Sequence, residues 1–438
     1  MNLSKHNKIE IIKNLGFSEL NEMQNATIDA ATQHPHLLLL APTGSGKTVA
    51  YLLSILSRIQ KKPGVQALIL VPTRELVLQV ESVLKQMKTG WKINVAYGGH
   101  PFSVERQNFT HPPEILIGTP GRVQDHMQRE TFDVSTIEQV VFDEFDKSLE
   151  LGFSKQMEFI RAELKHVKRQ LLVSATQRIE IPGYLQLKDL HTLDFSQEEK
   201  IDLELKQLLV SKEEKPEGLI KIINNLEDGE NALVFVNHRD ACDRIAEYFN
   251  IFKISYSIFH GGLEQDQREL ELTKFRNGSS RVLIATDIAS RGIDIPELDY
   301  VIHYQIPPQE TVFTHRNGRT ARMKATGTAV IIRSQLDKLP SYLQEEPENI
   351  KLKEGRELSQ SEWVTLYVGK GKKDKVNKID IVGFFLQFHF MAKDDIGLIE
   401  MKDYAAYIAV KRDKYQDLLK VSKDKKMKNK KPKIALAR

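Results

Sequence analysis

Short apolar runs alternate with helical patterns along most of the chain, and this alternation restricts the possible folds more than any other feature. In the first half, each run is followed by Gly, Pro, Ser or Thr and then by a helical pattern such as residues 47–60 or 74–87. The runs are residues 37–40, 67–71, 115–117, 140–142 and 171–173. Strands joined by helices favour a parallel sheet with helices on both faces. The first half is therefore predicted to be an α/β domain.

The same alternation returns in the second half and predicts a second α/β domain. Its expected strands are residues 232–236, 255–259, 282–285, 300–303 and 328–332. Between the two halves, residues 197–217 are polar and charged, and we place the interdomain linker at the start of this segment. A second break is expected at residues 340–355, where Pro347 and Gly355 interrupt a charged stretch.

A third, smaller unit follows, and its expected elements have the order β-α-β-β-α-β of a ferredoxin-like fold. The expected strands are residues 363–368, 397–401, 404–410 and 433–437, and the expected helices are residues 378–388 and 413–420. The predicted domains cover residues 1–198, 199–345 and 360–438.

Composition excludes several classes of protein. No apolar run approaches the roughly 18 residues that a membrane span needs, and the polar residues 1–10 lack the apolar stretch of a secretory signal. Cys242 is the only cysteine, so neither an internal disulfide nor a cysteine-rich zinc site is possible. We therefore expect a cytoplasmic protein that does not work at a membrane.

The net charge of +4 conceals an uneven distribution of charge along the chain. Residues 360–438 hold 19 Lys/Arg and 10 Asp/Glu, whereas the preceding residues hold 44 Lys/Arg and 49 Asp/Glu. A basic segment favours binding to a polyanion, because neutralised phosphates release their counterions. The alternative is a solvated basic surface without a partner.

Residues 41–48 have the sequence of a phosphate-binding loop, although Ala41 stands where the general motif has Gly. The segment follows a predicted strand and opens a predicted helix, so backbone N–H groups can surround a phosphate at the helix N-terminus. In such a loop the lysine reaches the β- and γ-phosphates and the following hydroxyl coordinates Mg²⁺. The predicted nucleotide-binding residues here are Thr43, Gly44, Ser45, Gly46, Lys47 and Thr48, and Thr48 is also a predicted metal ligand.

Two adjacent acids, Asp143 and Glu144, follow the predicted strand at residues 140–142. A nucleotide hydrolase needs carboxylates at this kind of position. We expect Asp143 to hold Mg²⁺ and Glu144 to polarise the attacking water. Lys47, Asp143 and Glu144 are thus predicted catalytic residues.

The tetrapeptide Asp143-Glu144-Phe145-Asp146 resembles the signature of the DEAD-box RNA helicases, with Phe145 where that family has Ala. Further segments resemble the other motifs of the family, in the same order, over about residues 15–335. They are residues 72–76, 98–99, 119–122, 174–176, 234–237, 265–268, 285–294 and 315–322. The resemblance implies two tandem RecA-like domains that bind ATP and RNA.

The resemblance also assigns roles around the nucleotide. The resemblance implies that Arg319 and Arg322 act as arginine fingers on the γ-phosphate. Two neighbouring residues, Asn317 and Ala321, depart from the usual motif. Other implied nucleotide-binding residues are Phe17, Gln24, Gly292 and Asp294, and the amide of Gln24 favours ATP over GTP.

On the RNA side, the resemblance implies contacts to the sugar-phosphate backbone, which carry little sequence information. The implied residues are Arg74, Gly99, Thr119, Arg122 and Thr286. Ser174 and Thr176 are expected to hydrogen-bond Asp146 and so link the ATP site to the RNA site.

The third unit resembles the RNA-binding domain of the DbpA/YxiN branch of bacterial helicases, an RNA-recognition-like fold. In that branch the domain anchors the enzyme to a hairpin of large-subunit ribosomal RNA, and related domains occur in cold-shock-type helicases. Expected RNA-binding residues are Lys370, Lys372 and Lys373, with a second lysine cluster at residues 420–433. Tyr404 and Tyr407 stack bases if they face outward on the sheet, or pack half-buried.

Together these features predict a monomeric, ATP- and Mg²⁺-dependent RNA helicase that remodels large-subunit ribosomal RNA or pre-ribosomal particles. Two alternatives stay open. One is a general cold-shock or RNA-decay helicase, and the other is an ATP-gated RNA clamp that does not unwind.

Overall fold

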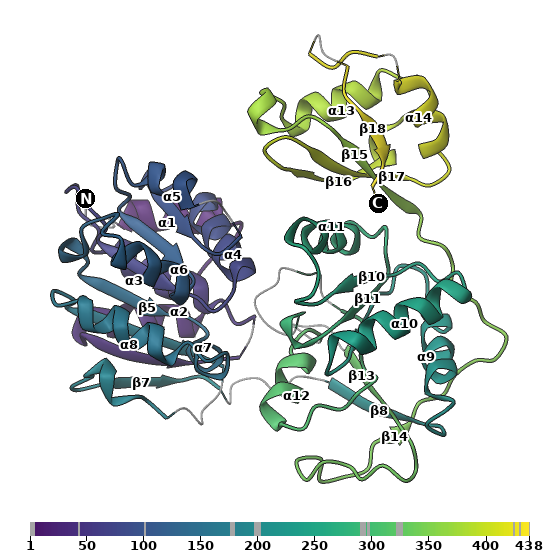
Figure 1. Ribbon diagram of the computed structural model, residues 1–438, viewed down its shortest axis with the longest axis horizontal. Helices are drawn as coiled ribbons and strands as arrows, with labels where there is room; N and C mark the ends of the chain where they lie inside the picture. The colour runs from purple at the N-terminus through teal and green to yellow at the C-terminus, as the bar shows by residue number, and fades with distance from the viewer. Residues whose placement is uncertain are drawn as a thin grey trace. The chain divides into compact units, whose positions relative to one another are not determined.

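The structure is a computed structural model that describes residues 5–42, 44–99, 102–175, 180–196, 203–289, 295, 298–320, 327–423, 425–428 and 431–437. The described residues fall into two compact units, one up to residue 196 and one from residue 203 onward (Figure 1). No helix within these ranges is long and apolar enough to cross a membrane.

The first unit contains a seven-stranded parallel sheet of order β3-β4-β2-β5-β6-β1-β7. The strands are β1 (His36–Leu40), β2 (Ala67–Leu70), β3 (Ile93–Ala96), β4 (Ile115–Gly118), β5 (Gln139–Phe142), β6 (Arg169–Ser174) and β7 (His191–Asp194). The predicted parallel α/β architecture is confirmed. Because the strands are parallel, the segments that leave β1, β2, β5 and β6 all lie at the carboxyl edge of this sheet, where ligands bind in such folds.

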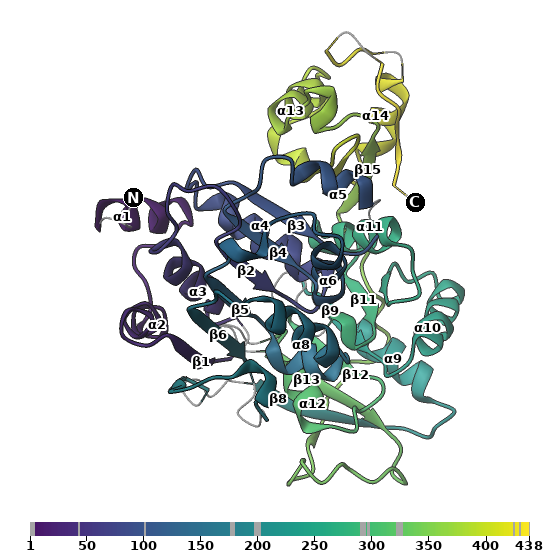
Figure 2. The ribbon, with the colours of Figure 1, turned by 60° about the vertical axis from the view of Figure 1, so that its left-hand side comes forward.

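Helices cover both faces of this sheet (Figure 2). One face packs against α2 (Glu22–Gln33), α3 (Lys47–Leu56) and α4 (Arg74–Gln86). The other packs against α6 (Pro120–Gln128), α7 (Phe145–Glu150) and α8 (Ser154–Glu163). Further helices of the unit are α1 (Lys5–Asn14) and α5 (Phe102–Asn108). Strands β1, β2, β4 and β5 are almost entirely buried, as expected for a sheet that is covered on both sides.

The second unit begins with another seven-stranded parallel sheet, of order β10-β11-β9-β12-β13-β8-β14. The strands are β8 (Leu203–Leu209), β9 (Ala232–Phe235), β10 (Ser257–Phe259), β11 (Val282–Ala285), β12 (Tyr300–His303), β13 (Gly327–Arg333) and β14 (Glu348–Asn349). The helices of this part are α9 (Lys215–Asn224), α10 (Arg239–Ile251), α11 (Gln265–Arg276) and α12 (Glu310–Asn317). The polar segment 197–217 contains β8, a strand that the sequence did not predict. Its charged side chains lie on a strand that is only partly buried.

The same unit ends in a four-stranded antiparallel sheet of order β16-β17-β15-β18. Its elements are β15 (Trp363–Val368), α13 (Lys378–Leu386), β16 (Ile396–Met401), β17 (Ala406–Lys411), α14 (Tyr415–Ser422) and β18 (Ile434–Leu436). The helices lie on one face of this sheet in Figure 1, over a core that includes Leu366, Phe385 and Ile408. The predicted ferredoxin-like order is confirmed. The expectation that the third strand starts at Tyr404 was wrong, because β17 starts at Ala406 and Tyr404 lies in the preceding turn.

Candidate nucleotide and RNA site

The phosphate-binding loop joins β1 to α3 through two glycines in left-handed conformation. Gly44 and Gly46 have φ values of +90° and +89°, which side chains rarely tolerate. The ammonium of Lys47 is buried and donates hydrogen bonds to the carbonyls of Ala41 (2.5 Å) and Pro42 (2.9 Å). The loop therefore closes around a buried positive charge, which suits a phosphate ligand.

The N-terminus of α2 braces this loop. The Asn21 side-chain amide donates to the carbonyl of Ser45 (2.9 Å), and the Gln24 amide donates to the carbonyl of Gly46 (3.3 Å). A methyl group on Gly46 would lie 2.4 Å from the Gln24 amide nitrogen, so only glycine at position 46 leaves room for the Gln24 side chain. Gln24 is buried, whereas Phe17 is 46% exposed. The structure thus brings Gln24 to the phosphate loop, and its adenine contact stays a prediction.

Two buried carboxylates follow β5 at the same edge of the sheet. Burial and the neighbouring Glu144 carboxylate raise the pKa of Asp143 to about 7. Asp143 Oδ2 accepts a hydrogen bond from the Tyr51 hydroxyl (2.9 Å). Glu144 has a left-handed φ of +47°, and no described residue provides a hydrogen-bond partner for its buried Oε2. The buried Asp143 carboxylate and the half-buried Thr48 hydroxyl are oxygen donors that fit a hard divalent cation such as Mg²⁺.

Phe145, the residue that departs from the family signature, is completely buried. Its ring packs edge-on against Phe142 at 5.9 Å in the apolar cluster beneath α6 and α8. The larger side chain is therefore accommodated by packing in the apolar core. Asp146 in α7 and Ser174 at the end of β6 are both buried in the same unit. The hydrogen bond expected between them stays a prediction.

The predicted RNA-binding residues Arg74 and Gly99 of the first unit lie side by side. The Arg74 guanidinium lies over the Tyr97 ring, 4.7 Å from its centre. Gly99 has a φ of +93°, and a methyl group there would come within 3.0 Å of Arg74 Nη1. The glycine therefore leaves room for the arginine.

Arg122 in α6 is held by a buried acid that the sequence motifs do not include. Glu105 Oε2 accepts a hydrogen bond from Arg122 Nε (2.6 Å) and lies 2.8 Å from His126 Nε2. Burial alone would raise the pKa of Glu105, but the hydrogen bonds from His126 and Arg122 hold it below its usual value. Arg122 also lies over the Phe102 ring, and Thr119 is the N-cap residue of α6. Only side-chain geometry reveals this support, because Glu105 belongs to no recognised motif.

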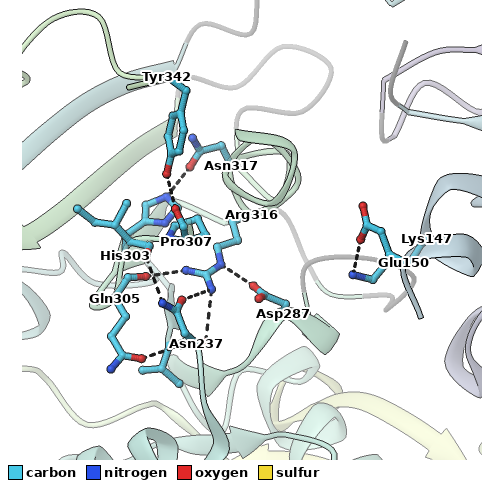
Figure 3. Close-up of polar contacts among 12 residues, drawn as sticks. Lys147, Glu150, Asn237, Asp287, His303, Gln305, Pro307, Arg316, Asn317 and Tyr342 are labelled. Carbon is cyan, nitrogen blue, oxygen red and sulfur yellow. Dashed lines mark hydrogen bonds and ion pairs between the residues drawn. The ribbon is translucent and has the colours of Figure 1, made fainter. Parts of the chain in front are cut away.

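In the second unit, one completely buried arginine connects three motifs (Figure 3). Arg316 Nε donates to Asp287 Oδ1 (2.6 Å), and its other nitrogens donate to Asn237 Oδ1 (2.8 Å) and to the carbonyl of Gln305 (2.7 Å). The half-buried Thr286 precedes Asp287. The sequence alone suggested no role for Arg316, although it lies within a recognised motif.

The unusual Asn317 has a specific partner in this unit. His303 Nε2 lies 2.8 Å from Asn317 Oδ1, and the imidazole stacks on Phe313 at 4.5 Å. Burial, together with the nearby Arg316, lowers the pKa of His303 to about 3. A neutral imidazole with its proton on Nε2 thus donates to the amide oxygen of Asn317. Arg319 is buried in the same unit, with 2% of its surface exposed.

The lysine-rich loop of the small antiparallel domain is fixed to the hairpin between β16 and β17. The backbone N–H groups of Lys372 and Lys373 donate to the carbonyls of Lys402 (2.9 Å) and Asp403 (2.8 Å). A methyl group on Gly371 would lie only 2.4–2.6 Å from atoms of that hairpin backbone.

The side chains of Lys372 and Lys373 point to solvent, whereas Lys370 pairs with Asp374 at 2.9 Å. Lys428 donates to the carbonyl of Lys375 (2.6 Å), so the two lysine clusters meet.

The open face of the four-stranded sheet contacts α11, which belongs to the seven-stranded domain of the same unit. Glu400 Oε2 accepts from the Thr273 hydroxyl (2.9 Å), and the Asn277 amide donates to the Thr365 hydroxyl (2.9 Å). Tyr407 lies on this face, and its pKa is raised by burial. Of the two alternatives stated for the tyrosines, half-buried packing describes Tyr407, whereas Tyr404 is 71% exposed and lies in the turn before β17.

Several predicted site residues lie outside the described residues, and their roles stay predictions. They are Thr43, Thr176, Gly292, Asp294 and Arg322.

Comparison with protein families shows three matches in chain order. A DEAD/DEAH box helicase domain matches residues 21–181, a helicase conserved C-terminal domain matches residues 214–324, and a DbpA RNA binding domain matches residues 365–436. The fold and the phosphate loop define a helicase core with an attached RNA-binding domain.

Curated relatives extend the similarity over nearly the whole chain. The ATP-dependent RNA helicase DbpA of Escherichia coli (strain K12) is 30% identical, with 92% of this chain and 91% of the relative covered. The ATP-dependent RNA helicase DbpA of Bacillus subtilis (strain 168) is 28% identical over 98% of this chain and 97% of the relative. The chain belongs to the DEAD-box ATP-dependent RNA helicases, which are RNA-stimulated ATPases, and among them it resembles DbpA.

Solved structures confirm the fold of the two RecA-like domains. The DEAD-box helicase Mss116 bound to ssRNA and UDP-BeF is 25% identical and superposes with a TM-score of 0.66, covering 76% of this chain and 73% of that chain. The S. cerevisiae protein Dbp5 bound to RNA and ADP BeF3 gives a TM-score of 0.67 at 24% identity, covering 76% of this chain and 88% of that chain.

Proposed function

We propose that this helicase locally unwinds short RNA duplexes in large-subunit ribosomal RNA or pre-ribosomal particles, as a monomer in the cytoplasm. The observation that supports a ribosomal RNA target is the match of residues 365–436 to the DbpA RNA binding domain. Its exposed lysines are fixed to the fold through Gly371 and the β16–β17 hairpin, so they present a defined phosphate-binding surface.

The nucleotide chemistry is assigned to the carboxyl edge of the first sheet. Lys47 donates to phosphate oxygens in place of the loop carbonyls that it now contacts. Thr48 and Asp143 hold Mg²⁺, which supplies charge neutralisation for phosphoryl transfer when it is bound. Glu144, whose buried Oε2 lacks a described partner, orients the attacking water. Arg319 and Arg322 are assigned to the charge that develops on the γ-phosphate.

RNA contacts in the helicase core are assigned to backbone-binding residues. Arg74 and Arg122 are each oriented by an aromatic ring, and Arg122 also by Glu105. Such contacts hold an RNA strand without reading its bases. Selection of the target is therefore assigned to the C-terminal domain.

The ribosomal assignment is tested by ATPase stimulation. We expect fragments of large-subunit ribosomal RNA to stimulate hydrolysis at far lower concentration than random RNA of equal length. Equal stimulation by both would favour the alternative of a general cold-shock or RNA-decay helicase. Hydrolysis with RNA that leaves short duplexes paired would instead identify a non-unwinding clamp.

A further inference from the structure

A buried phenol contacts Asp143, one of the two side chains assigned to Mg²⁺. Tyr51 is in α3, three residues after Thr48, so both side chains lie on the same side of the helix. The Tyr51 hydroxyl donates to Asp143 Oδ2 at 2.9 Å, across 92 residues of sequence. The phosphate-loop helix and the acidic end of β5 are thereby connected at one oxygen atom.

The ring of Tyr51 has no exposed surface and belongs to the apolar cluster between the sheet and helices α2, α3 and α4. A phenylalanine would fill the same space, so packing does not explain the hydroxyl. A buried hydroxyl requires a polar partner, and the partner of this hydroxyl, Asp143, is a predicted metal ligand. Burial, followed by the Asp143 charge, raises the Tyr51 pKa well above its usual value, so the phenol keeps its proton.

The phenol also determines how the Asp143 carboxylate is oriented. Oδ2 accepts from Tyr51, and Oδ1 accepts from the backbone N–H of Glu144 at 2.9 Å. With both oxygens held, rotation of the carboxylate is restricted before any ligand binds. A carboxylate oxygen has two lone pairs, so Oδ2 can accept the hydrogen bond from the phenol and still bind a cation.

We propose that Tyr51 is a positioning residue that pre-orients Asp143 for the divalent cation of a bound nucleotide. The proposal rests on the metal ligands assigned under the proposed function and adds a residue that the family motifs do not contain. Groups that orient metal ligands by hydrogen bonds typically change metal affinity by about 10–100-fold when they are removed. Because Asp143 keeps its second hydrogen bond, we expect the low end of this range.

The test deletes only the hydroxyl, with Tyr51→Phe in the full chain. Mn²⁺ is used as the probe, and its binding to the protein–ADP complex is measured by electron paramagnetic resonance. Binding of a fluorescent ADP analogue in EDTA is measured in parallel. We expect Mn²⁺ affinity to fall roughly tenfold while ADP binding in EDTA is unchanged.

Ser54→Ala is the matched control. Ser54 lies one turn further along α3, is also buried, and donates its hydroxyl to the backbone carbonyl of Ala50 (2.9 Å). Its loss is expected to leave Mn²⁺ affinity unchanged.

Unchanged or tighter Mn²⁺ binding in Tyr51→Phe would overturn the proposal, because the phenol would then be a spectator or would occupy the metal's place. If Tyr51→Phe cannot bind ADP in EDTA, the hydroxyl-free variant Tyr51→Met supplies the same comparison. Failure of the wild-type protein to bind Mn²⁺ with ADP would refute the metal assignment itself, which is a different result.

Discussion

Replacement of Arg316 by methionine tests whether the motifs of the second RecA-like domain depend on one buried charge. Arg316 is completely buried and donates to Asp287, to Asn237 and to backbone carbonyls. Methionine fills similar space without donors, so Asp287 loses its ion pair with Arg316 and the carbonyl of Gln305 loses a donor.

The magnitude follows from the environment of the pair. Removing one partner of a buried ion pair costs about 3–5 kcal/mol. The Asp287 side chain is 33% exposed, so water recovers part of this loss and the expected cost is near the lower limit, about 3 kcal/mol. For a unit of this size, each kcal/mol corresponds to about 2–4 °C, so the unit should melt about 6–12 °C lower.

Hydrogen–deuterium exchange during thermal unfolding gives the readout for each unit separately. In Arg316→Met, faster exchange is expected in peptides that contain Asn237, Asp287 and Gln305, with no change in the first unit. Arg316→Lys should be intermediate, because lysine keeps the charge but not the planar fork. Arg239→Met is the control, since Arg239 is 71% exposed at the start of α10. If Arg316→Met melts at the wild-type temperature and exchanges at wild-type rates, the reasoning is refuted.

Four further predictions follow from the site. Burial lowers the pKa of His303 from 6.5 to about 3, so between these pH values the unfolded state binds a proton that the folded state does not. The free energy of unfolding should therefore fall as the pH drops from 6.5 towards 3, by up to about 1.4 kcal/mol per pH unit. His303→Gln should weaken this pH dependence in denaturant titrations. Gly371→Ala should weaken RNA binding, measured by fluorescence anisotropy, because its methyl group meets the 402–405 backbone at 2.4–2.6 Å; Gly383→Ala, with open space around it, is the control. Exchanging Lys372 and Lys373 for Gln should reduce the salt dependence of RNA affinity by about one ion for each lysine replaced, while ATP binding is unaffected; an unchanged slope would remove these lysines from the RNA site. Glu144→Gln should retain nucleotide binding and lower the single-turnover rate of ATP hydrolysis by about 10²-fold or more, and a near-normal rate would exclude Glu144 as the residue that orients water.

The central strands were predictable because they are buried on both faces. Strands β1, β2, β4 and β5 are continuous apolar runs, and the structure places them within one or two residues of the expected positions. The partly exposed β7 and β8 mix charged and apolar residues, since one side of each is less covered. A local pattern cannot distinguish such strands from a polar connection.

The site shows the same division between local and tertiary information. The loop glycines, Lys47 and the acids have local signatures, and their order along the chain identifies the family. The residues that support them have none. Tyr51 lies 92 positions from Asp143, Glu105 lies 17 from Arg122, and Arg316 lies 29 from Asp287. Their importance comes from tertiary contacts, which spacing in one sequence does not reveal.

The contact between α11 and the four-stranded sheet affects what can be learned from fragments of this chain. A fragment comprising only residues 360–438 would expose Thr365, Glu400 and the Tyr367–Tyr407 pair, which the intact chain places on the face towards α11. Nucleic acid could stack on such a newly uncovered sheet. Binding that the fragment shows and the full chain lacks would then report an artificial surface. RNA footprints of the intact helicase should therefore map to the lysine loop, and fragment studies need the second RecA-like domain to be included.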